Sequence, residues 1–274
     1  MSTPHVSFIG AGNMARSLIG GLIADGWPAD RLRATDPDPE QRSDIASRFG
    51  IAVGGDNAAA VAGAEVVVLA VKPQVMHAVA AEIAAAAQAH RPLIISIAAG
   101  IRSADLDRWL GGDAAIVRCM PNTPALVQSG ATALFANPRV GAEQRDRAET
   151  ILRAVGLTLW LEREELMDAV TALSGSGPAY FFLIMEALQA AGERLGLPAD
   201  TARLLALQTA FGAAKMALES PEDAAVLRRR VTSPGGTTER ALQVLEDGGL
   251  RDLVLRALTA ARDRSHELAD QLGK

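Results

Sequence analysis

The chain has 274 residues, of which 49% are hydrophobic and 22% are charged. This length and balance predict a globular protein with room for two domains, and they exclude a disordered or collagen-like chain. The net charge is −5, and the basic residues are dispersed apart from residues 228–230, so no nucleic-acid partner is expected. Charged residues interrupt the longest apolar tracts before the ~18 residues that a membrane span needs, so no membrane partner is expected either.

The cysteine content and the opening of the chain indicate the compartment. The single cysteine, Cys119, has no partner for an intrachain disulfide, which is typical of a reducing environment. The opening MSTPHVSFIGAGNMARS has no basic segment followed by a long apolar stretch, so no signal peptide is expected. We therefore expect a cytoplasmic protein.

Short apolar runs alternate with helical stretches along residues 1–160. This rhythm is typical of βα units on a mainly parallel sheet, whose central strands are buried on both faces. The expected strands are residues 5–10, 31–35, 65–71, 92–97, 115–119 and 131–135. The first part of the chain is therefore predicted to be an α/β domain.

The strand signal ends near residue 160, and residues 161–274 are predicted to be all α. Helical patterns cover residues 164–172, 178–195, 199–219, 237–247 and 250–272. The helix from Pro178 is apolar on nearly every face at its start, so other helices must surround it. Too few helices follow to do so from one chain, which favours a second subunit; the alternative is a single-chain bundle around a central helix.

A glycine-rich sequence joins the first predicted strand to the first helix. Gly10 permits a tight turn, Gly12 lets the backbone approach a pyrophosphate, and Ala15 keeps helix and strand close. The N–H groups at the helix start then face the phosphates. The predicted dinucleotide loop consists of Gly10, Ala11, Gly12, Asn13, Met14 and Ala15.

The residues after the second strand bear on the form of the cofactor. Asp36 stands where an acidic side chain bonds the adenosine ribose hydroxyls and repels a 2′-phosphate, which favours NAD. Arg42 lies near enough in the sequence to neutralise such a phosphate, and Asp36-Pro37 is also a common turn opener. The sequence therefore leaves NADP and NAD open as cofactors.

Two further strand ends are predicted to line the nucleotide crevice, because ligands of open α/β sheets bind outside the carboxyl ends of the strands. Lys72 is either a catalytic base or a charged loop residue, and the second interpretation is favoured. Asn122 and Thr123 either reach a ligand or cap backbone groups. The predicted crevice residues are Val71, Lys72, Pro73, Ala98, Ala99 and Gly100.

Two loops of small residues, 174–178 and 232–238, are each predicted to end at a helix N-terminus. Free N–H groups there attract an anion, although both loops are also plausible helix caps. The second loop, with four hydroxyl groups and two glycines, is the better candidate for a substrate carboxylate. No metal-binding, Walker or nucleophile-elbow motif occurs, and the four histidines are scattered, so catalysis without a metal or a triad is expected.

Six motifs, in the same order from residue 5 to about 270, resemble those of the pyrroline-5-carboxylate reductases: FIGAGNMA, AVKP, SIAAGI, RCMPNTPA, SGSGPAY and VTSPGGTT. The resemblance implies an NAD(P)-dependent oxidoreductase acting on a CH–NH bond. Hydride transfer from NADPH or NADH to the C=N bond of 1-pyrroline-5-carboxylate would give L-proline, the last step of proline biosynthesis. The resemblance also implies a Rossmann domain over residues 1–160. Residues 161–274 would form an all-α domain that binds substrate and makes a homodimer, with dimers gathered into rings such as a decamer of five dimers.

The resemblance also implies roles for particular residues. Asn57 and Ala70 join the dinucleotide-binding residues named above. The Thr238 hydroxyl would be catalytic and bond the ring nitrogen, and an iminium substrate needs orientation and electrostatic support more than a general base. Backbone N–H groups would hold the substrate carboxylate at Ser233, Gly235, Gly236 and Thr237.

One stretch departs from the family pattern. Residues 224–225 and 227–229 read Ala-Ala and Leu-Arg-Arg where the family has Pro-Gly and a Leu-Lys-Asp step, so a base replaces the acid expected near Arg229. This difference leaves open which contacts residues 224–229 make with a partner subunit and whether Glu222 has a role. A reductase of the β-hydroxyacid dehydrogenase type is the alternative enzyme, but it would need a lysine that residues 174–180 lack. A nucleotide-sensing regulator is the non-enzymatic alternative, but such a protein would not need the anion site predicted at residues 232–238.

Overall fold

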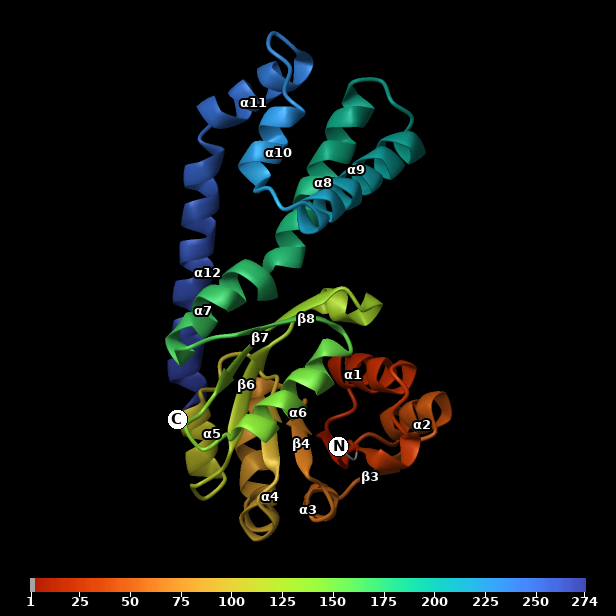
Figure 1. Ribbon diagram of the computed structural model, residues 1–274, viewed down its shortest axis with the longest axis vertical. Coiled ribbons are helices and arrows are strands. Elements are labelled where there is room, and N and C mark those ends of the chain that lie inside the picture. The colour runs from red at the N-terminus through yellow and green to blue at the C-terminus, as the bar shows by residue number, and fades with distance from the viewer. Residues whose placement is uncertain (1–2) are drawn as a thin grey trace. The chain divides into compact units, whose positions relative to one another are not determined.

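The computed structural model describes residues 3–274, and the chain divides into two compact units (Figure 1). The first unit runs to Ser176 and takes up the chain again from Ala261, and the second is Gly177–Ala260. The segment between residue 160 and Ser176 packs with the α/β unit. The end of the last helix belongs to that unit as well.

The first unit contains one eight-stranded sheet in the order β3-β2-β1-β4-β5-β6-β7-β8. Only the β6–β7 pair is antiparallel, so the predicted mainly parallel sheet is confirmed. The two edge strands, β3 and β8, are not among the predicted strands. The strands are β1 (Val6–Ile9), β2 (Leu32–Thr35), β3 (Ala52–Gly54), β4 (Val66–Leu69), β5 (Leu93–Ser96), β6 (Ile116–Met120), β7 (Gly130–Ala136) and β8 (Gly156–Trp160).

Helices cover both faces of this sheet. One core contains Phe8 and Val68 with residues of α1, α2 and α6, and the other contains Ile9 and Val67 with residues of α3, α4 and α5. Adjacent residues of one strand thus enter opposite cores, which explains the unbroken apolar strand sequences. The helices are α1 (Asn13–Ala24), α2 (Pro39–Phe49), α3 (Asn57–Val61), α4 (Met76–His90), α5 (Ser103–Trp109), α6 (Ala142–Arg153) and α7 (Met167–Val170).

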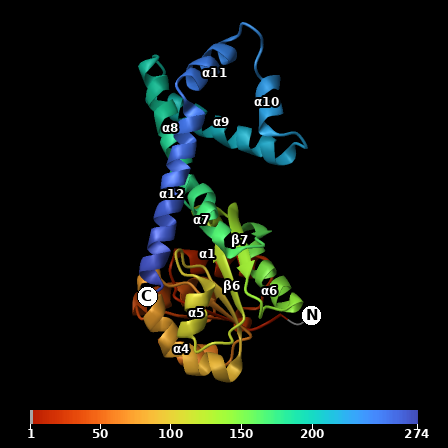
Figure 2. The ribbon, with the colours of Figure 1, turned by 90° about the vertical axis from the view of Figure 1, so that its left-hand side faces the viewer.

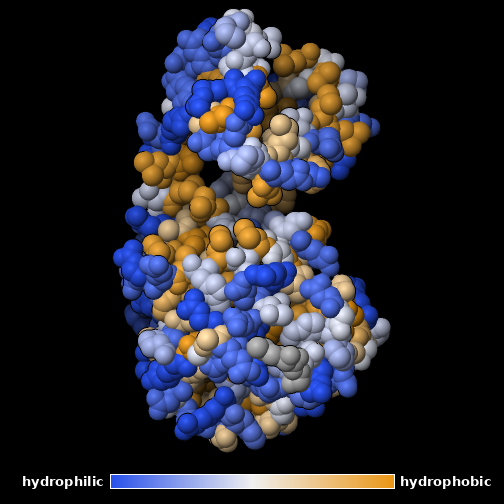
Figure 3. Space-filling view, viewed as in Figure 1, coloured by the Kyte–Doolittle hydropathy of each residue, from blue (hydrophilic) through white to orange (hydrophobic). Residues whose placement is uncertain are grey.

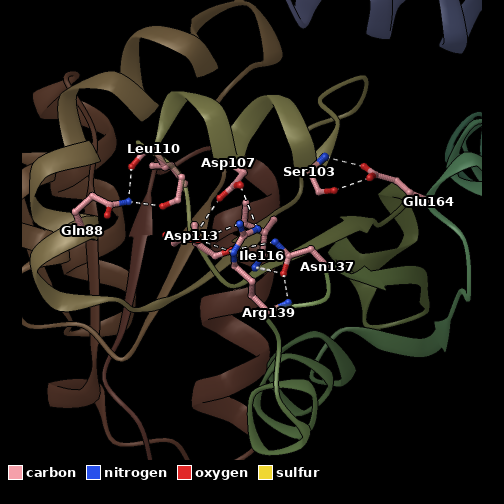
Figure 4. Close-up of polar contacts among 11 residues, drawn as sticks. Gln88, Ser103, Asp107, Leu110, Asp113, Ile116, Asn137, Arg139 and Glu164 are labelled. Carbon is pink, nitrogen blue, oxygen red and sulfur yellow. Dashed lines mark hydrogen bonds and ion pairs between the residues drawn. The ribbon is translucent and has the colours of Figure 1, made fainter.

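A buried ion pair attaches the segment after β8 to the sheet. Arg118 on β6 is 5% exposed, and its Nη1 lies 2.9 Å from Glu164 Oε1. Glu164 also accepts hydrogen bonds from Ser103 N at 2.7 Å and Ser103 Oγ at 2.5 Å, at the start of α5 (Figure 4). The ion pair gives the buried guanidinium of Arg118 a partner that would be costly to lose, and together with the Ser103 bonds it holds residues 161–166 on the α/β unit.

The second unit is helical, and no strand follows Trp160 in the described part of the chain (Figure 2). The short helix α10 was not predicted; it begins where Asp223 accepts a hydrogen bond from Val226 N at 2.8 Å. The combination of a mainly parallel sheet with an all-α C-terminal part confirms the predicted fold class. The helices are α8 (Gly177–Arg194), α9 (Ala199–Glu219), α10 (Ala224–Arg230), α11 (Thr237–Asp247) and α12 (Leu250–Leu272), the last of which continues into the first unit.

The prediction of an open loop at residues 174–178 is wrong. Residues Thr171–Gly175 form a π-helical turn that leads into α8, and Ser176 N donates to Thr171 O at 2.8 Å. A Cβ placed on Gly175 would come within 2.3 Å of Met120 Cε, so a larger residue there would require the flexible Met120 side chain to move. The N–H of Ser176 is therefore already bonded, and this segment is not the free helix N-terminus that an anion site requires.

The start of α8 presents apolar side chains outward. Phe181, Phe182, Leu183 and Ile184 are each more than half exposed. Hydrophobic residues accordingly gather on the surface of the helical unit (Figure 3). Helix α9 packs along α8 but leaves these side chains exposed, so the described helices of one chain do not enclose the start of α8 as a single-chain bundle would. None of the helices described for residues 3–274 is long and apolar enough to cross a bilayer.

Candidate active site

The predicted dinucleotide residues of the α/β unit meet at one edge of the sheet. Strands β1, β2, β4 and β5 are parallel, so the loops after them leave from the same side. Gly10 N donates to Thr35 O at 2.8 Å, and Ala70 N donates to Ile9 O at 2.8 Å. The glycine loop, Asp36 and Ala70 are thereby neighbours.

Glycine is needed at the two positions of the loop for different physical reasons. Gly10 has φ +99°, and a side chain there would come within 2.8 Å of Ala70 O, so the fold itself requires glycine. Gly12 has φ −71°, and no atom of the described chain lies within 4 Å of a Cβ placed on it. It is the N-cap of α1, whose first turn receives no side-chain cap, while Ala15 behind it is fully buried. The space above Gly12 is therefore open, beside uncapped N–H groups that suit a phosphate.

Asp36 follows β2 and is bonded to the glycine loop. Its Oδ2 accepts a hydrogen bond from Ala11 N at 2.8 Å, and its Oδ1 accepts one from Asp38 N at 3.0 Å. Arg42 Nη1 donates to Asp36 O at 2.7 Å and to Pro37 O at 3.1 Å. The carboxylate thus lies at the strand end, while the arginine supports the main chain of its loop.

Asn57 is held beside the end of β2 by two side chains. Its Oδ1 accepts a hydrogen bond from Thr35 Oγ1 at 2.6 Å, and its Nδ2 donates to Glu82 Oε2 at 2.9 Å. This arrangement gives the amide one orientation at the edge of the sheet, next to Asp36.

The loops after β4 and β5 complete this edge. Lys72 is exposed and precedes a 3₁₀ turn at Pro73–Val75. Ala98 is buried, and Gly100, with φ +72°, lies so close to α12 that a side chain would come within 3.2 Å of Leu272 Cδ1. The end of the last helix therefore packs directly against the third predicted cofactor loop.

Asn122, after β6, caps backbone groups. Its Oδ1 accepts from Ala131 N at 2.9 Å, and its Nδ2 donates to Ser174 Oγ at 3.3 Å. The side chain therefore joins β7 and the π-helical turn to the sheet edge.

The loop at residues 232–238 lies in the helical unit, before α11. Gly235 has φ +72°, and Gly236 is the N-cap of α11 without a side-chain cap. Thr237 and Thr238 begin that helix and are exposed. The predicted substrate residues therefore lie together around one helix N-terminus.

A carboxylate of the chain already bonds this loop. Gly235 N donates to Glu239 Oε2 at 2.7 Å. Glu239 was not singled out from the sequence, although an acid three residues after the N-cap is the spacing of a capping box. Its position shows that an N–H group of the loop binds a carboxylate.

A hollow of about 730 Å³ opens beside the loop, and Arg228, Arg229 and Arg240 line it. Glu246 pairs with Arg228 at 3.2 Å, and a hydrogen bond from Arg251 lowers the pKa of Glu246 below its ordinary value. Arg228 and Arg229, which stand in the stretch that departs from the family pattern, therefore line this hollow together with Glu239 and Glu246.

Thiol chemistry has no support in the structure. Burial raises the pKa of the Cys119 thiol well above its ordinary value, so the group stays neutral. Among residues 3–274, no three His, Cys, Asp or Glu side chains gather as a metal site would need.

A doubly wound sheet with a glycine loop after its first strand, an acid after its second and a separate helical unit defines the two-domain NAD(P)-dependent oxidoreductases. Residues 5–100 match a family model described as NADP oxidoreductase coenzyme F420-dependent, and residues 164–268 match one described as pyrroline-5-carboxylate reductase dimerisation. A pyrroline-5-carboxylate reductase from Pseudomonas aeruginosa is 58% identical over 274 residues, which is 100% of both chains. The chain belongs to the pyrroline-5-carboxylate reductase family.

Solved structures agree with this assignment. A pyrroline-5-carboxylate reductase from Coxiella burnetii has 48% identity and a TM-score of 0.94, over 97% of this chain and 99% of its own. The Plasmodium falciparum pyrroline carboxylate reductase, solved with NADP bound, has 28% identity and a TM-score of 0.86, over 98% of this chain and 99% of its own. The reaction is the last step of proline biosynthesis, the reduction of 1-pyrroline-5-carboxylate to proline with NAD(P)H, and the enzyme is a homo-oligomer.

Proposed function

We propose that residues of the α/β unit hold the dinucleotide and that the 232–238 loop holds the substrate. The observation that carries the first half is the open space over Gly12 beside an uncapped helix. The observation that carries the second half is the N–H of Gly235, which already binds a carboxylate. The residues proposed for the dinucleotide are Gly10, Ala11, Gly12, Asn13, Met14, Ala15, Asp36, Asn57, Ala70, Val71, Lys72, Pro73, Ala98, Ala99 and Gly100.

Bound NAD(P)H supplies the hydride, and the chain supplies orientation and charge. Backbone N–H groups of Ser233, Gly235, Gly236 and Thr237 hold the substrate carboxylate. The Thr238 oxygen accepts a hydrogen bond from the protonated ring nitrogen and so holds the C=N carbon in place for attack. Because the iminium already carries its proton, no side chain has to deliver one, and catalysis rests on positioning.

Steady-state kinetics with 1-pyrroline-5-carboxylate and either NADH or NADPH, with proline measured as product, tests this proposal. Cofactor oxidation without proline formation would contradict it.

We also propose a cytoplasmic location, a functional division at residue 160 and rings of five dimers, which the family resemblance supports. Light scattering on the purified enzyme distinguishes two chains from ten.

Replacing Thr238 by alanine should slow turnover while substrate still binds. A hydrogen bond to a charged group contributes roughly 1.5–3 kcal/mol, and its loss leaves the C=N carbon poorly positioned for the hydride, so kcat/KM should fall about 10- to 100-fold. Thr238→Ser restores the hydroxyl and should recover most of the rate. If Thr238 only stabilises the start of α11, the alanine variant will instead melt earlier with little kinetic change. Melting temperatures and kinetics of both variants separate these outcomes, and a full-rate alanine variant removes Thr238 from the mechanism.

Glu239 should compete with the substrate carboxylate for the N–H of Gly235. Glu239→Gln keeps the length of the side chain but removes its charge, so KM for 1-pyrroline-5-carboxylate should fall about fivefold, the equivalent of ~1 kcal/mol, with kcat unchanged. Asp247→Asn, at the other end of α11, removes the same charge without touching the loop and should leave KM unchanged. An unchanged or higher KM in the glutamine variant would show that Glu239 does not occupy the substrate position.

A further inference from the structure

The carboxylate of Asp36 is fixed at the place where an adenosine ribose binds. In a doubly wound sheet the residue after the second strand faces this ribose. Ala11 N and Asp38 N each donate to one of its oxygens, at 2.8 and 3.0 Å. A carboxylate has about four lone-pair sites, so two remain for ribose hydroxyls. The glycine loop thus orients the same acid that the ribose would meet.

The groups around this position are mostly negative. Asp38, the N-cap of α2, and Glu40, in the first turn of that helix, follow Asp36 and are exposed. Arg42 is the one arginine of residues 36–42, and two main-chain oxygens already accept hydrogen bonds from its Nη1. Arg16, on α1, pairs with Asp44 at 3.3 Å. A phosphate with two negative charges would enter a region where acids outnumber available cations.

We infer that Asp36 makes this enzyme prefer NADH to NADPH. The 2′-hydroxyl of NADH can donate to the carboxylate, whereas the 2′-phosphate of NADPH meets a like charge at hydrogen-bond range. Arg42 supports the loop that presents this acid, and it is not the phosphate ligand. The inference rests on the proposed placement of the dinucleotide and adds which of its two forms the site selects.

The competing explanation gives Asp36 a structural role only, as the acceptor for Ala11 N. Loss of the carboxylate would then loosen the glycine loop and weaken both cofactors equally. The ratio of kcat/KM for NADH to that for NADPH separates the two explanations, because damage to the loop cancels in the ratio.

The experiment measures this ratio in the wild type and in three variants. The wild-type ratio should exceed about ten, since like charges at close range cost at least that factor even with solvent screening. Asp36→Ser, which removes the charge and keeps an acceptor, should lower the ratio at least about tenfold. Arg42→Met should change both cofactors alike. Asp30→Asn removes a charge just before β2, at the end of that strand opposite to Asp36, and should leave the ratio within about twofold of the wild type.

Fluorescence titration with NAD⁺ and NADP⁺ gives a second readout that does not depend on turnover. A wild-type preference for NADPH, or a ratio that Asp36→Ser leaves unchanged, overturns the inference. So does a selective loss of NADPH use in Arg42→Met, which would make Arg42 the phosphate ligand. Absence of proline formation with both cofactors, in contrast, contradicts the proposed function, while the titration still reports the selectivity.

Discussion

Gly12→Val is expected to abolish dinucleotide binding while the protein stays folded. The backbone angles of Gly12, φ −71° and ψ −178°, are open to valine, and no atom of the described chain would meet the new side chain. The branched group instead fills the space into which a pyrophosphate must come. Kd for NADH and NADPH should rise at least about 100-fold, or ~2.7 kcal/mol, in calorimetric titrations.

Gly141→Val is the matched control. Gly141 is the N-cap of α6, with φ −79° and ψ 172°, and it likewise has no neighbour within 4 Å. It follows β7, which runs antiparallel to β6, so it does not share the edge proposed for the dinucleotide. Its valine variant should bind both cofactors normally. Unchanged affinity in Gly12→Val would show that this glycine is only part of a turn.

Ile184→Asp is expected to break the homodimer. Ile184 is 53% exposed in the single chain and belongs to the apolar start of α8, which a second subunit must cover. A lone carboxylate buried in that interface costs about 3–5 kcal/mol, enough to weaken dimerisation more than about 100-fold. Light scattering at micromolar concentration should show monomer or aggregate instead of dimer.

Ile184→Leu keeps the volume and the apolar character of the side chain and should remain dimeric, since such exchanges cost little. Activity measured alongside reports whether the enzyme needs the dimer. A dimeric, fully active Ile184→Asp variant would place the subunit interface elsewhere, whereas a wild-type protein that is monomeric at this concentration would contradict the inference that a second subunit covers α8.

Local sequence patterns were enough to predict much of this protein. The central strands and long helices follow from periodicity, and the dinucleotide loop follows from Gly10, Gly12 and Ala15 at one strand–helix junction. The need for a second subunit follows from a helix with no polar face. These features depend on neighbouring residues, so the sequence carries them directly. The strands β3 and β8 escaped prediction because they are edge strands without a run of buried residues, and each has a glycine at one end.

The tertiary structure alone decided how distant residues are used. Asp36 accepts a hydrogen bond from Ala11 N, 25 residues away, and this contact fixes the acid of an ambiguous Asp-Pro pair beside the glycine loop. Arg102 pairs with Asp270 across 168 residues, so the last helix returns to the α/β unit that the sequence divides from it. The residues expected to form a loop before Pro178 form a π-helical turn instead, and Asn122, 52 residues earlier, donates a hydrogen bond to Ser174 in that turn. Such contacts join segments that are far apart along the chain. Local propensity depends on neighbouring residues, so it cannot predict which distant segments come into contact.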